Sequence, residues 1–532
     1  MNSTRSGAAI VMLLAVTGCG RAPEAPPAAA AVPDLAEYDI ARLQRGMQDG
    51  TLDSRRITQW SLNRIAALDD AGPMLNAVVA INPDALAIAD ERDAERRAGK
   101  VRGPLHGIPV LLKDNIDTGD RQLTTAGSLA LTGAPAARDS EVARRLREAG
   151  AVILGKANLS EWANIRSTRS TSGWSAVGGL TRNPYVLDRN PCGSSSGSGV
   201  AVAAGMVVAA IGTETDGSIV CPASVNGVVG FKPTVGLVSR RGIVPIAHSQ
   251  DTAGPMTRSV ADAAILLDAI AGSDSADPAT GEADARRTGF RAALDEATLR
   301  GRRIGVVRDH GGGAGEESKV ILDAAVVTLK AQGAEIVDPV ALPPSSDYSD
   351  DELAVLLFEL RADLSEYLRE RGTATVSSLA DVIAFNQREA AVEMPWFGQE
   401  LFLQAERNGG VKPAEYRAKR ERIRRLAGPQ GIDSALAAGR LDALVAITCG
   451  PAWVSDLVYG DNPGVSCSSS PAAIAGYPSA SVPAGFVDGL PVGVSFTAGA
   501  WQDARVLAMA HAFERAHAAR RPPTYRTSVD AR

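Results

Sequence analysis

The sequence contains few of the side chains from which most catalytic triads and metal centres are built. Its 532 residues include five histidines and five cysteines, and the cysteines follow no metal-binding spacing. The net charge is −6, and the absence of a basic stripe with interleaved aromatic residues argues against nucleic acid as a partner. No segment recurs with a period of about 20–50 residues, which excludes a repeat fold.

Glycine and serine, by contrast, are concentrated in residues 190–256. This segment includes Cys192-Gly-Ser-Ser-Ser-Gly-Ser-Gly and Gly212-Thr-Glu-Thr-Asp-Gly-Ser-Ile. Short apolar runs separate its turns, whereas a flexible linker has none. Because glycine costs backbone entropy, the composition predicts a chain that must approach a bound molecule closely and direct N–H groups at it.

Apolar segments of strand length alternate with helical patterns along the rest of the chain. One helix is expected to begin at Asp34, and a second is expected to be N-capped by Ser54. Further helices are expected at 85–98, 141–149, 260–270, 319–332, 352–371, 379–406, 413–427 and 503–519, and strands at 106–113, 150–155, 303–307, 334–337, 444–447, 479–483 and 492–496. The pattern predicts one large α/β domain, residues 34–528, with helices on both faces of its sheet.

The first 33 residues have the composition of a targeting segment. Arg5 precedes a short apolar run at 8–16, which is too brief for a typical membrane span. The following Val16-Thr-Gly-Cys19 resembles a bacterial lipobox. We therefore expect a lipoprotein-type signal peptide at 1–18 and an Ala/Pro-rich tether at 19–33, lipidated at Cys19. The protein would then be an exported membrane lipoprotein facing the periplasm; the alternative is an ordinary secretory signal.

Several catalytic motifs can be compared with the Gly/Ser segment. A phosphate-binding loop needs a lysine after its last glycine, and Gly197-Ser-Gly-Val has none. Gly193-Ser-Ser-Ser-Gly matches a nucleophile elbow with Ser195 as nucleophile, but no late histidine has a convincing acidic partner. None of the eight lysines has a serine three residues before it, which excludes a penicillin-binding type site.

A serine nucleophile activated by lysine fits better. Lys113 ends an apolar strand, where desolvation lowers the pKa of an amine and lets it accept a proton near neutral pH. The hydroxyls after Gly193 could relay that proton. Gly217 permits a tight turn before Ser218, and successive N–H groups in such a turn form a nest for an oxyanion.

These motifs together resemble the amidase signature family. The resemblance rests on Pro109-Val-Leu-Leu-Lys-Asp-Asn, the Gly193-Ser-Ser-Ser-Gly run, and Gly212-Thr-Glu-Thr-Asp-Gly-Ser-Ile with Phe231-Lys-Pro-Thr. It covers nearly all of the chain after the tether, and within the family the sequence is most similar to bacterial peptide amidases. The resemblance implies a mixed central sheet covered by helices on both faces.

The resemblance also implies roles for individual residues. Ser218 would be the acyl-forming nucleophile, Ser194, after a cis peptide bond, the bridging hydroxyl, and Lys113 the terminal base, with Ser195 in support. Backbone N–H groups of Thr215, Asp216, Gly217 and Ser218 would form the oxyanion hole. Two departures from the family pattern are Cys192 before Gly193, where many members have a second glycine, and Asp216, where others have glycine. The Asp216 side chain is expected either to point away from the site or to shape its specificity.

We therefore expect a serine amidohydrolase that cleaves carboxamide C–N bonds without a metal or organic cofactor. The expected substrates are C-terminal amides of peptides, with release of ammonia; aryl or fatty amides are the alternative. An amidotransferase subunit, an α/β-hydrolase-type esterase and a catalytically silent binding lipoprotein are weaker alternatives. The expected partners are a small amide or peptide-amide substrate, no nucleic acid, and a membrane only through the lipid anchor, in a monomer or homodimer.

The remaining residues of interest receive structural interpretations. A disulfide between Cys192 and Cys221 is compatible with an oxidising compartment, but we expect these two cysteines, like Cys449 and Cys467, to be free and packed as small apolar residues. Lys156, Lys232, His106 and His248 are interpreted as packing residues. Trp453 and Tyr459 are expected at the rim of the pocket.

Lipidation at Cys19 is directly testable. Cys19→Ala should move the protein out of the membrane fraction, because a stable anchor depends on the acyl chains. Cell fractionation and the intact mass of the mature protein measure this, and a mature mass without a diacylglyceryl increment would contradict it.

Overall fold

The structure, a computed structural model, describes residues 32–309, 315–372, 375–407, 411–462 and 467–530. The expected signal peptide and Cys19 lie outside the described residues, as does almost all of the tether. Residues Asp34–Arg532 form one compact unit. Within the described residues, no helix combines the length and the apolar character needed to cross a bilayer.

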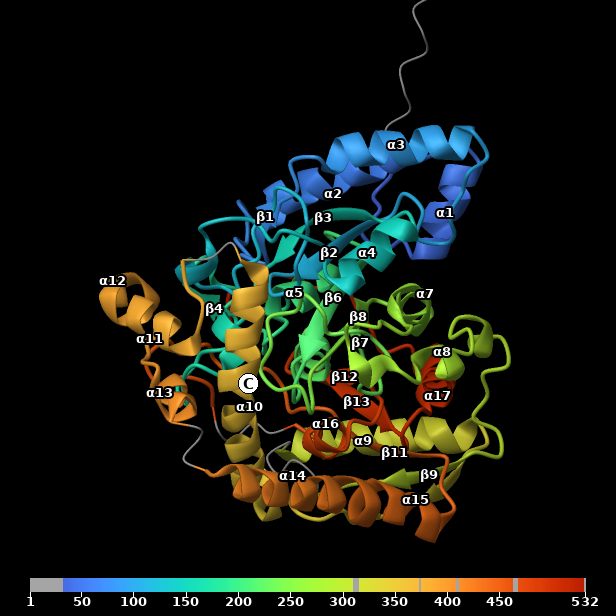
Figure 1. Cartoon of the computed structure of the whole chain (residues 1–532). Helices are drawn as coiled ribbons and strands as arrows, with labels where there is room; N and C mark the ends of the chain where they lie inside the picture. Colours follow the sequence, from blue (N-terminus) through green and yellow to red (C-terminus); the bar gives the residue numbers. More distant parts are fainter. Residues whose placement is uncertain (1–31, 310–314, 373–374, 408–410, 463–466, 531–532) are drawn as a thin grey trace, which may run out of the picture. The chain divides into compact units, whose positions relative to one another are not determined.

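A mixed β-sheet forms the centre of the compact unit (Figure 1). Its eleven strands in the described part of the chain follow the order β1-β3-β2-β6-β8-β7-β12-β13-β11-β9-β10. The pairs β3–β2, β2–β6, β11–β9 and β9–β10 are parallel, and the remaining pairs are antiparallel. The predicted α/β class with a mixed sheet is confirmed.

The strands of this sheet have the following bounds: β1 Val78–Ile81, β2 Pro109–Lys113, β3 Val152–Ala157, β6 Ala209–Glu214, β7 Val229–Lys232, β8 Thr252–Thr257, β9 Arg303–Val306, β10 Glu335–Val337, β11 Ala443–Ile447, β12 Ser479–Val487 and β13 Leu490–Thr497. Two short strands, β4 Trp174–Ser175 and β5 Gly179–Leu180, form a separate hairpin.

The helices are α1 Ile40–Gln48, α2 Ser54–Leu68, α3 Ala85–Arg97, α4 Glu141–Glu148, α5 Ser196–Ala203, α6 Val220–Val225, α7 Val260–Ile270, α8 Ala283–Arg286, α9 Gly315–Ala331, α10 Ser349–Arg371, α11 Leu379–Arg388, α12 Ala390–Glu393, α13 Glu400–Glu406, α14 Pro413–Ala427, α15 Asp433–Gly439, α16 Ser470–Ala475 and α17 Asp503–His517. Helices α4, α7, α17 and α9 contact one another in turn and pack on one face of the sheet. Helices α5 and α6 contact each other and pack on the other face.

Three helix predictions need correction. The first helix begins at Ile40 rather than near Asp34, because Asp39 caps it by accepting from the N–H of Arg42. Asp53, not Ser54, caps α2 by accepting from the N–H of Arg56. The helix expected at 379–406 is divided into α11, α12 and α13. Pro395 follows α12, and proline cannot donate the backbone hydrogen bond that a continuing helix needs.

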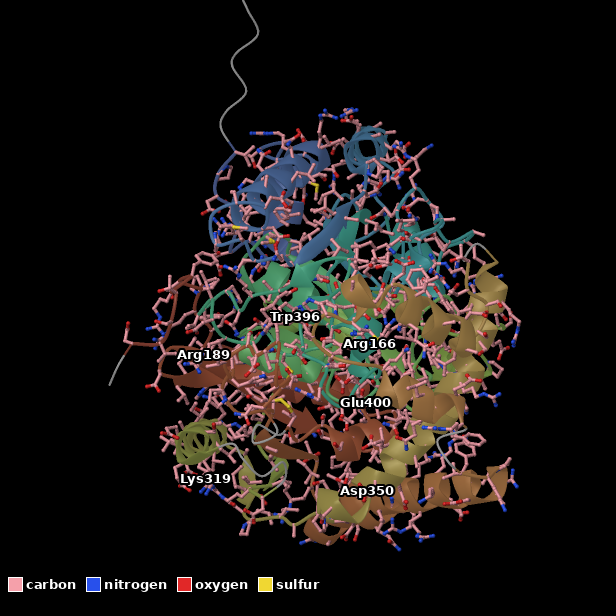
Figure 2. The ribbon with its side chains drawn as sticks, turned by 90° about the vertical axis from the view of Figure 1, so that its left-hand side faces the viewer. Arg166, Arg189, Lys319, Asp350, Trp396 and Glu400 are labelled. Atoms are coloured by element: carbon pink, nitrogen blue, oxygen red, sulfur yellow. A yellow bond between two sulfur atoms is a disulfide. The ribbon has the colours of Figure 1, made fainter. Side chains whose placement is uncertain are left out.

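Helices α10, α11 and α13 share an apolar cluster with the segments that follow β2 and β3. Within this region Arg166 is fully buried and forms an ion pair with Glu161, 2.8 Å between Nη1 and Oε1. The Glu400 carboxylate at the start of α13 accepts from Ser167 Oγ and Thr168 N, each at 2.7 Å. Arg166 and Glu400 are labelled in Figure 2. These contacts fix the α10–α13 region against the segment that follows β3.

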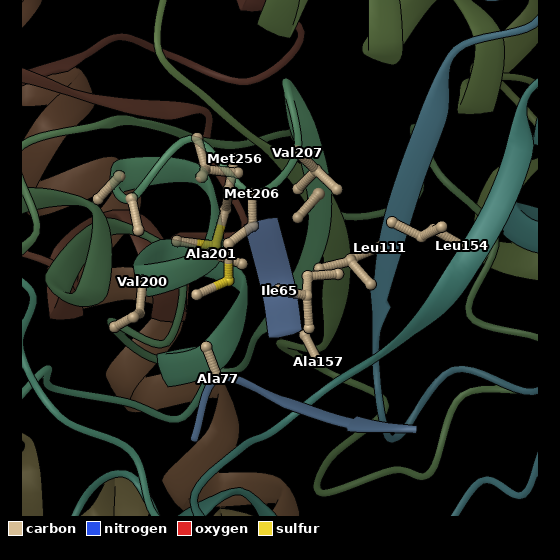
Figure 3. Packing of buried hydrophobic residues seen from close by; sticks show 14 of the residues in the cluster. Ile65, Ala77, Leu111, Leu154, Ala157, Val200, Ala201, Met206, Val207 and Met256 are labelled. Atoms are coloured by element: carbon tan, nitrogen blue, oxygen red, sulfur yellow. The ribbon is translucent and has the colours of Figure 1, made fainter. Parts of the chain in front are cut away.

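A dense aliphatic core lies between α5 and strands β2, β3 and β8 (Figure 3). Leu111, Leu154, Val200 and Met256 are fully buried in it. Gly197 lets α5 approach the neighbouring backbone closely. A Cβ at this position would lie 2.2 Å from the carbonyl oxygen of Ala77 and 2.6 Å from backbone atoms of Asn158.

We therefore expect Gly197→Ala to destabilise the fold. The added methyl group meets backbone atoms that cannot rotate aside, and overpacking of this kind costs about 1–3 kcal/mol or more. Thermal or denaturant unfolding measures the change. Gly133→Ala is the control, because a Cβ there meets nothing within 4 Å. An unchanged melting temperature for Gly197→Ala would contradict the prediction.

Candidate active site

Three chain segments meet at one edge of the sheet. Strands β2 and β6 are parallel neighbours, with Leu112 beside Ile211, so their carboxyl ends lie together. Lys113 ends β2, and Glu214 ends β6. The turn at 192–195 leads into α5, and its Ser194 lies within hydrogen-bond distance of Lys113.

Lys113 is fully buried and its amine has three polar contacts. Nζ lies 2.7 Å from Ser194 Oγ, 2.8 Å from Thr213 Oγ1 and 3.2 Å from the Thr213 carbonyl oxygen. Desolvation lowers the pKa of Lys113 from 10.5 to about 7, although the negative charges of Asp251 and Glu214 oppose the shift. The amine is therefore poised to gain or lose a proton near neutral pH.

Ser194 lies in an unusual turn. The Gly193–Ser194 peptide bond is cis, as the family resemblance implied. The Ser194 carbonyl accepts from the N–H of Ser160 at 3.1 Å. A Cβ at position 193 would lie 2.0 Å from Ser160 Oγ. A side chain at position 193 would therefore displace the Ser160 hydroxyl, which favours glycine before Ser194.

Ser218 follows a tight turn. Gly217 has φ +79°, a left-handed conformation that favours glycine. Ser218 is 8% exposed, and its carbonyl accepts from the N–H of Ser195 at 3.2 Å. Among the described residues this backbone bond joins the two serine segments, while no hydrogen bond links the Ser194 and Ser218 hydroxyls.

Ser195 is not placed to act as a nucleophile. Its Oγ donates to the Thr213 carbonyl at 3.0 Å and accepts from the Thr213 N–H at 3.1 Å. The side chain is fully buried. It therefore holds the end of β6 against the start of α5, which agrees with the supporting role expected for it.

The turn 215–218 is supported by residues that the sequence did not identify as site residues. Glu214 Oε2 accepts from the N–H groups of Ile219 and Val220 at 2.7 and 3.0 Å. Thr215 Oγ1 donates to Asp251 Oδ1 at 2.6 Å, and Gln250 Nε2 donates to the Thr215 carbonyl at 3.3 Å. Glu214 ends β6 and is not the N-cap residue of α6, so no local capping pattern pointed to it. Asp251 and Gln250 likewise gave no indication.

The Asp216 side chain points away from the Lys113–Ser194 pair. Its Oδ2 accepts from Ser470 Oγ at 2.6 Å, and it also meets the side chains of Ser469 and Glu352. This settles the orientation that the sequence left open.

A cavity of about 620 Å³ opens beside the catalytic segments. Ser194, Thr213 and Thr215 line it, together with the loop 240–246 and the side chains of Asp363, Glu366, Tyr367 and Glu370 on α10. Ser218 borders the site from the next turn and does not line the cavity. The cavity is large enough for a substrate of several residues' size.

Trp453 and Tyr459, which were expected at the rim of the pocket, lie away from this cavity. Neither residue lines the cavity. Trp453 is buried, and its Nε1 donates to Asp461 Oδ1 at 3.3 Å. Tyr459 is 78% exposed.

The prediction of free cysteines is also wrong. Cys192 is bonded to Cys221, and Cys449 to Cys467. The first disulfide forms because the turn before α5 and the helix after Ser218 lie side by side, with their Cα atoms 6.1 Å apart. Sequence separation alone could not establish that proximity.

Charged groups near the cavity form ion-paired clusters. Ligand atoms of His248, Glu359 and Asp363 lie within 4.8 Å of one another, as a metal site would require. His248 Nδ1 lies 2.9 Å from Asp363 Oδ2, and Glu359 accepts from Ser249 N and Tyr416 OH at 2.9 and 2.6 Å. Their lone pairs are thus engaged within the protein. His106, whose Nε2 meets the Arg92 carbonyl at 2.9 Å, is a packing residue.

The hydrogen bonds of Lys156 and Lys232 indicate a structural role for both lysines. Lys156 Nζ donates to the Ile116 carbonyl at 2.5 Å and to Thr124 Oγ1 at 2.8 Å. Lys232 Nζ donates to the Pro233 carbonyl at 3.1 Å. Burial lowers the pKa of Lys232 to about 8, although the negative charge of Glu214 opposes the shift. The structure thus places Lys113 alone among these three next to the serine turn.

Comparison with known proteins agrees with this arrangement. The family model described as Amidase matches residues 56–507. A probable amidase of Arabidopsis thaliana is 42% identical over 502 residues, covering 92% of each chain. One of the glutamyl-tRNA(Gln) amidotransferase subunits of Symbiobacterium thermophilum is 36% identical over 487 residues, covering 89% of this chain and 96% of its own.

A crystal structure of native peptide amidase from Stenotrophomonas maltophilia superposes with a TM-score of 0.87 at 53% identity, covering 92% of this chain and 99% of that one. The buried lysine, the serine turn and the glycine turn described above lie within the matched region. This chain therefore belongs to the amidase signature family and is a hydrolase that acts on amides.

Proposed function

We propose that Ser218, Ser194 and Lys113 form the catalytic triad of this amidase. Ser218 Oγ attacks the carbonyl carbon of the amide while its proton passes to Ser194, whose own proton passes to Lys113. The C–N bond then breaks, and the leaving amine takes a proton back along the same route. Water hydrolyses the resulting Ser218 ester and regenerates the enzyme. The 2.7 Å contact between Lys113 Nζ and Ser194 Oγ is the observation that best supports this scheme.

The electrostatics of the site support Lys113 as the base. A base must be neutral before it can accept a proton, and efficient proton transfer needs a pKa near the working pH. Burial brings the pKa of Lys113 to about 7. Ser194 contacts the amine, and the next residue, Ser195, donates its N–H to the Ser218 carbonyl, which supports a relay through Ser194.

The oxyanion hole is proposed at the turn 215–218. Backbone N–H groups of Thr215, Asp216, Gly217 and Ser218 would stabilise the tetrahedral oxyanion. The left-handed Gly217 makes the tight turn, and Glu214, Gln250 and Asp251 hold its ends. Rigid donors of this kind act strongly because they need no reorganisation during the reaction.

The triad is tested by labelling with a fluorophosphonate probe. Ser218→Ala should abolish labelling and lower turnover more than about 10³-fold, and Ser194→Ala or Lys113→Ala should also cripple turnover. The wild-type labelling rate should rise as pH increases through about 7, since Lys113 accepts a proton only when neutral. Mass mapping identifies the modified serine. Ser195→Ala is the control and should still be labelled; labelling that survives Ser218→Ala but not Ser195→Ala would make Ser195 the nucleophile.

For the substrate, we propose C-terminal carboxamides of peptides, with release of ammonia. The support is the 53% identity to a structure named as peptide amidase. A cavity of about 620 Å³, a volume typical of ligand pockets, lies beside Ser194. Aryl or fatty amides are the competing substrates and would need a long apolar acyl channel. The cavity instead carries charged side chains such as Arg240, Asp363 and Glu366.

This specificity is tested with three matched substrates. A peptide amide should release ammonia, whereas the same peptide with a free carboxylate has no terminal amide bond and should release none. The corresponding anilide should react at least about tenfold more slowly, because a primary amide has the smallest leaving group. Ammonia and aniline release measure the rates. Anilide turnover without ammonia from any peptide amide would overturn the proposed substrate and leave the amidase family unchanged.

We also propose export and anchoring through a lipid on Cys19, with the enzyme as a monomer or homodimer. The two disulfides support export, because disulfides persist mainly in oxidising compartments.

A further inference from the structure

The Asp216 side chain lies behind the proposed oxyanion turn, in a pocket shared with a second carboxyl group. Glu352, in the first turn of α10, is 7% exposed and meets the Asp216 carboxyl. Asp216 Oδ1 is buried and finds no hydrogen-bond donor among the described residues. Two carboxylates in contact cannot both ionise at low cost, so the contact between these carboxyl groups needs a proton.

The same pair is connected to the backbone of the turn. Gln250 Nε2 donates to Glu352 Oε1 at 2.9 Å and to the Thr215 carbonyl at 3.3 Å. Ser470 Oγ donates to Asp216 Oδ2 at 2.6 Å. Glu352 is therefore connected to the turn in two ways. Gln250 links it to Thr215, and its contact with the Asp216 side chain links it to the backbone of Asp216.

We propose that Glu352 and Asp216 share one proton and that this bond positions the N–H groups of the turn 215–218 for the oxyanion. Glu352 is then a positioning residue that never touches the substrate. The inference rests on the proposed role of this turn as the oxyanion hole. It explains why Asp216 is accommodated at a position where other members of the family have glycine.

Loss of the shared proton should disturb the turn. Two negative charges in contact repel, and the Asp216 side chain is attached to one of the proposed donors. Donors are effective only within about 2.7–3.1 Å of the oxyanion, and loss of one donor costs about 10²–10³ in rate. We therefore expect kcat to fall at alkaline pH with little change in KM.

Other ionisable groups lie near the pair, and their effects on the pH profile must be distinguished from those of the pair. Lys232 at the end of β7 is the nearby cation, Glu214 lies across the turn, and Tyr348 precedes α10. Burial is the largest cause that raises the pKa of both Asp216 and Glu352. Substitution of Glu352 alone removes the shared proton and leaves these other groups in place.

The test compares pH profiles of wild type, Glu352→Gln and Glu352→Ala. In Glu352→Gln the amide oxygen still accepts from Gln250 and the amide NH₂ donates to Asp216, with no proton to lose. This variant should keep kcat within about threefold at neutral pH and lose the alkaline decline. Glu352→Ala leaves both partners unsatisfied and should lower kcat about 10–100-fold, with KM changed less than about threefold. Circular dichroism melts establish that each variant is folded.

Asp350→Asn is the matched control, because Asp350 is an exposed carboxylate in the same helical turn (Figure 2). It should keep the wild-type profile. Three results would overturn the inference alone: an active wild type without an alkaline decline in kcat, a decline that persists in Glu352→Gln, or a folded Glu352→Ala with wild-type kcat. A wild type and Asp350→Asn that both fail to turn over any amide would overturn the proposed function, and this inference with it.

Discussion

The site depends on a primary amine that is held out of water at the end of a strand. A charged ammonium without solvent is costly, so burial drives Lys113 toward its neutral form. The cost is kept moderate by two hydroxyl oxygens and one carbonyl oxygen, which satisfy the amine in either protonation state. The lysine side chain itself is fully buried.

Two parts of the fold, the strands β2 and β6 and the helix α10, contribute residues to the site. The parallel strands β2 and β6 bring Lys113 and the turn after Glu214 together, since neighbouring parallel strands end at the same edge of the sheet. Helix α10 lies outside the sheet and contributes Glu352 behind the proposed oxyanion turn and Asp363 and Glu366 along the cavity. The buried lysine thus ends a strand, the two serines lie in turns next to strand and helix ends, and α10 contributes one side of the cavity.

The sequence predicted the elements with strong local patterns. The strand ending at Lys113 and the helix capped by Ser259 are found where the periodicity and capping residues placed them. The helix expected at 379–406 ends at Arg388 and is interrupted again after Glu393, where the helix breaker Pro395 was overlooked. Family motifs identified Lys113, Ser194 and Ser218 because these residues lie in short, distinctive stretches.

Other features of the site could not be read from the sequence because they depend on tertiary proximity. Glu352 lies more than a hundred residues from Asp216 in a helix with an ordinary acidic first turn, and nothing local distinguishes it from its exposed neighbours. The disulfides and the burial of Trp453 similarly depend on which loops the fold brings together. When the neighbouring residues in the sequence are those of an exposed helix, nothing in the sequence indicates that one of them is buried at a functional site.

The Cys192–Cys221 disulfide has a consequence for the denatured chain. The covalent ring that it closes spans 29 residues and contains Ser194, Ser195 and Ser218. In the chain-entropy account, closing a ring of this size stabilises the native state by roughly 3–4 kcal/mol, because the unfolded chain has fewer conformations to lose. The two serine segments therefore remain neighbours even when the sheet around them has melted, and only the lysine has to be brought back to them from outside the ring.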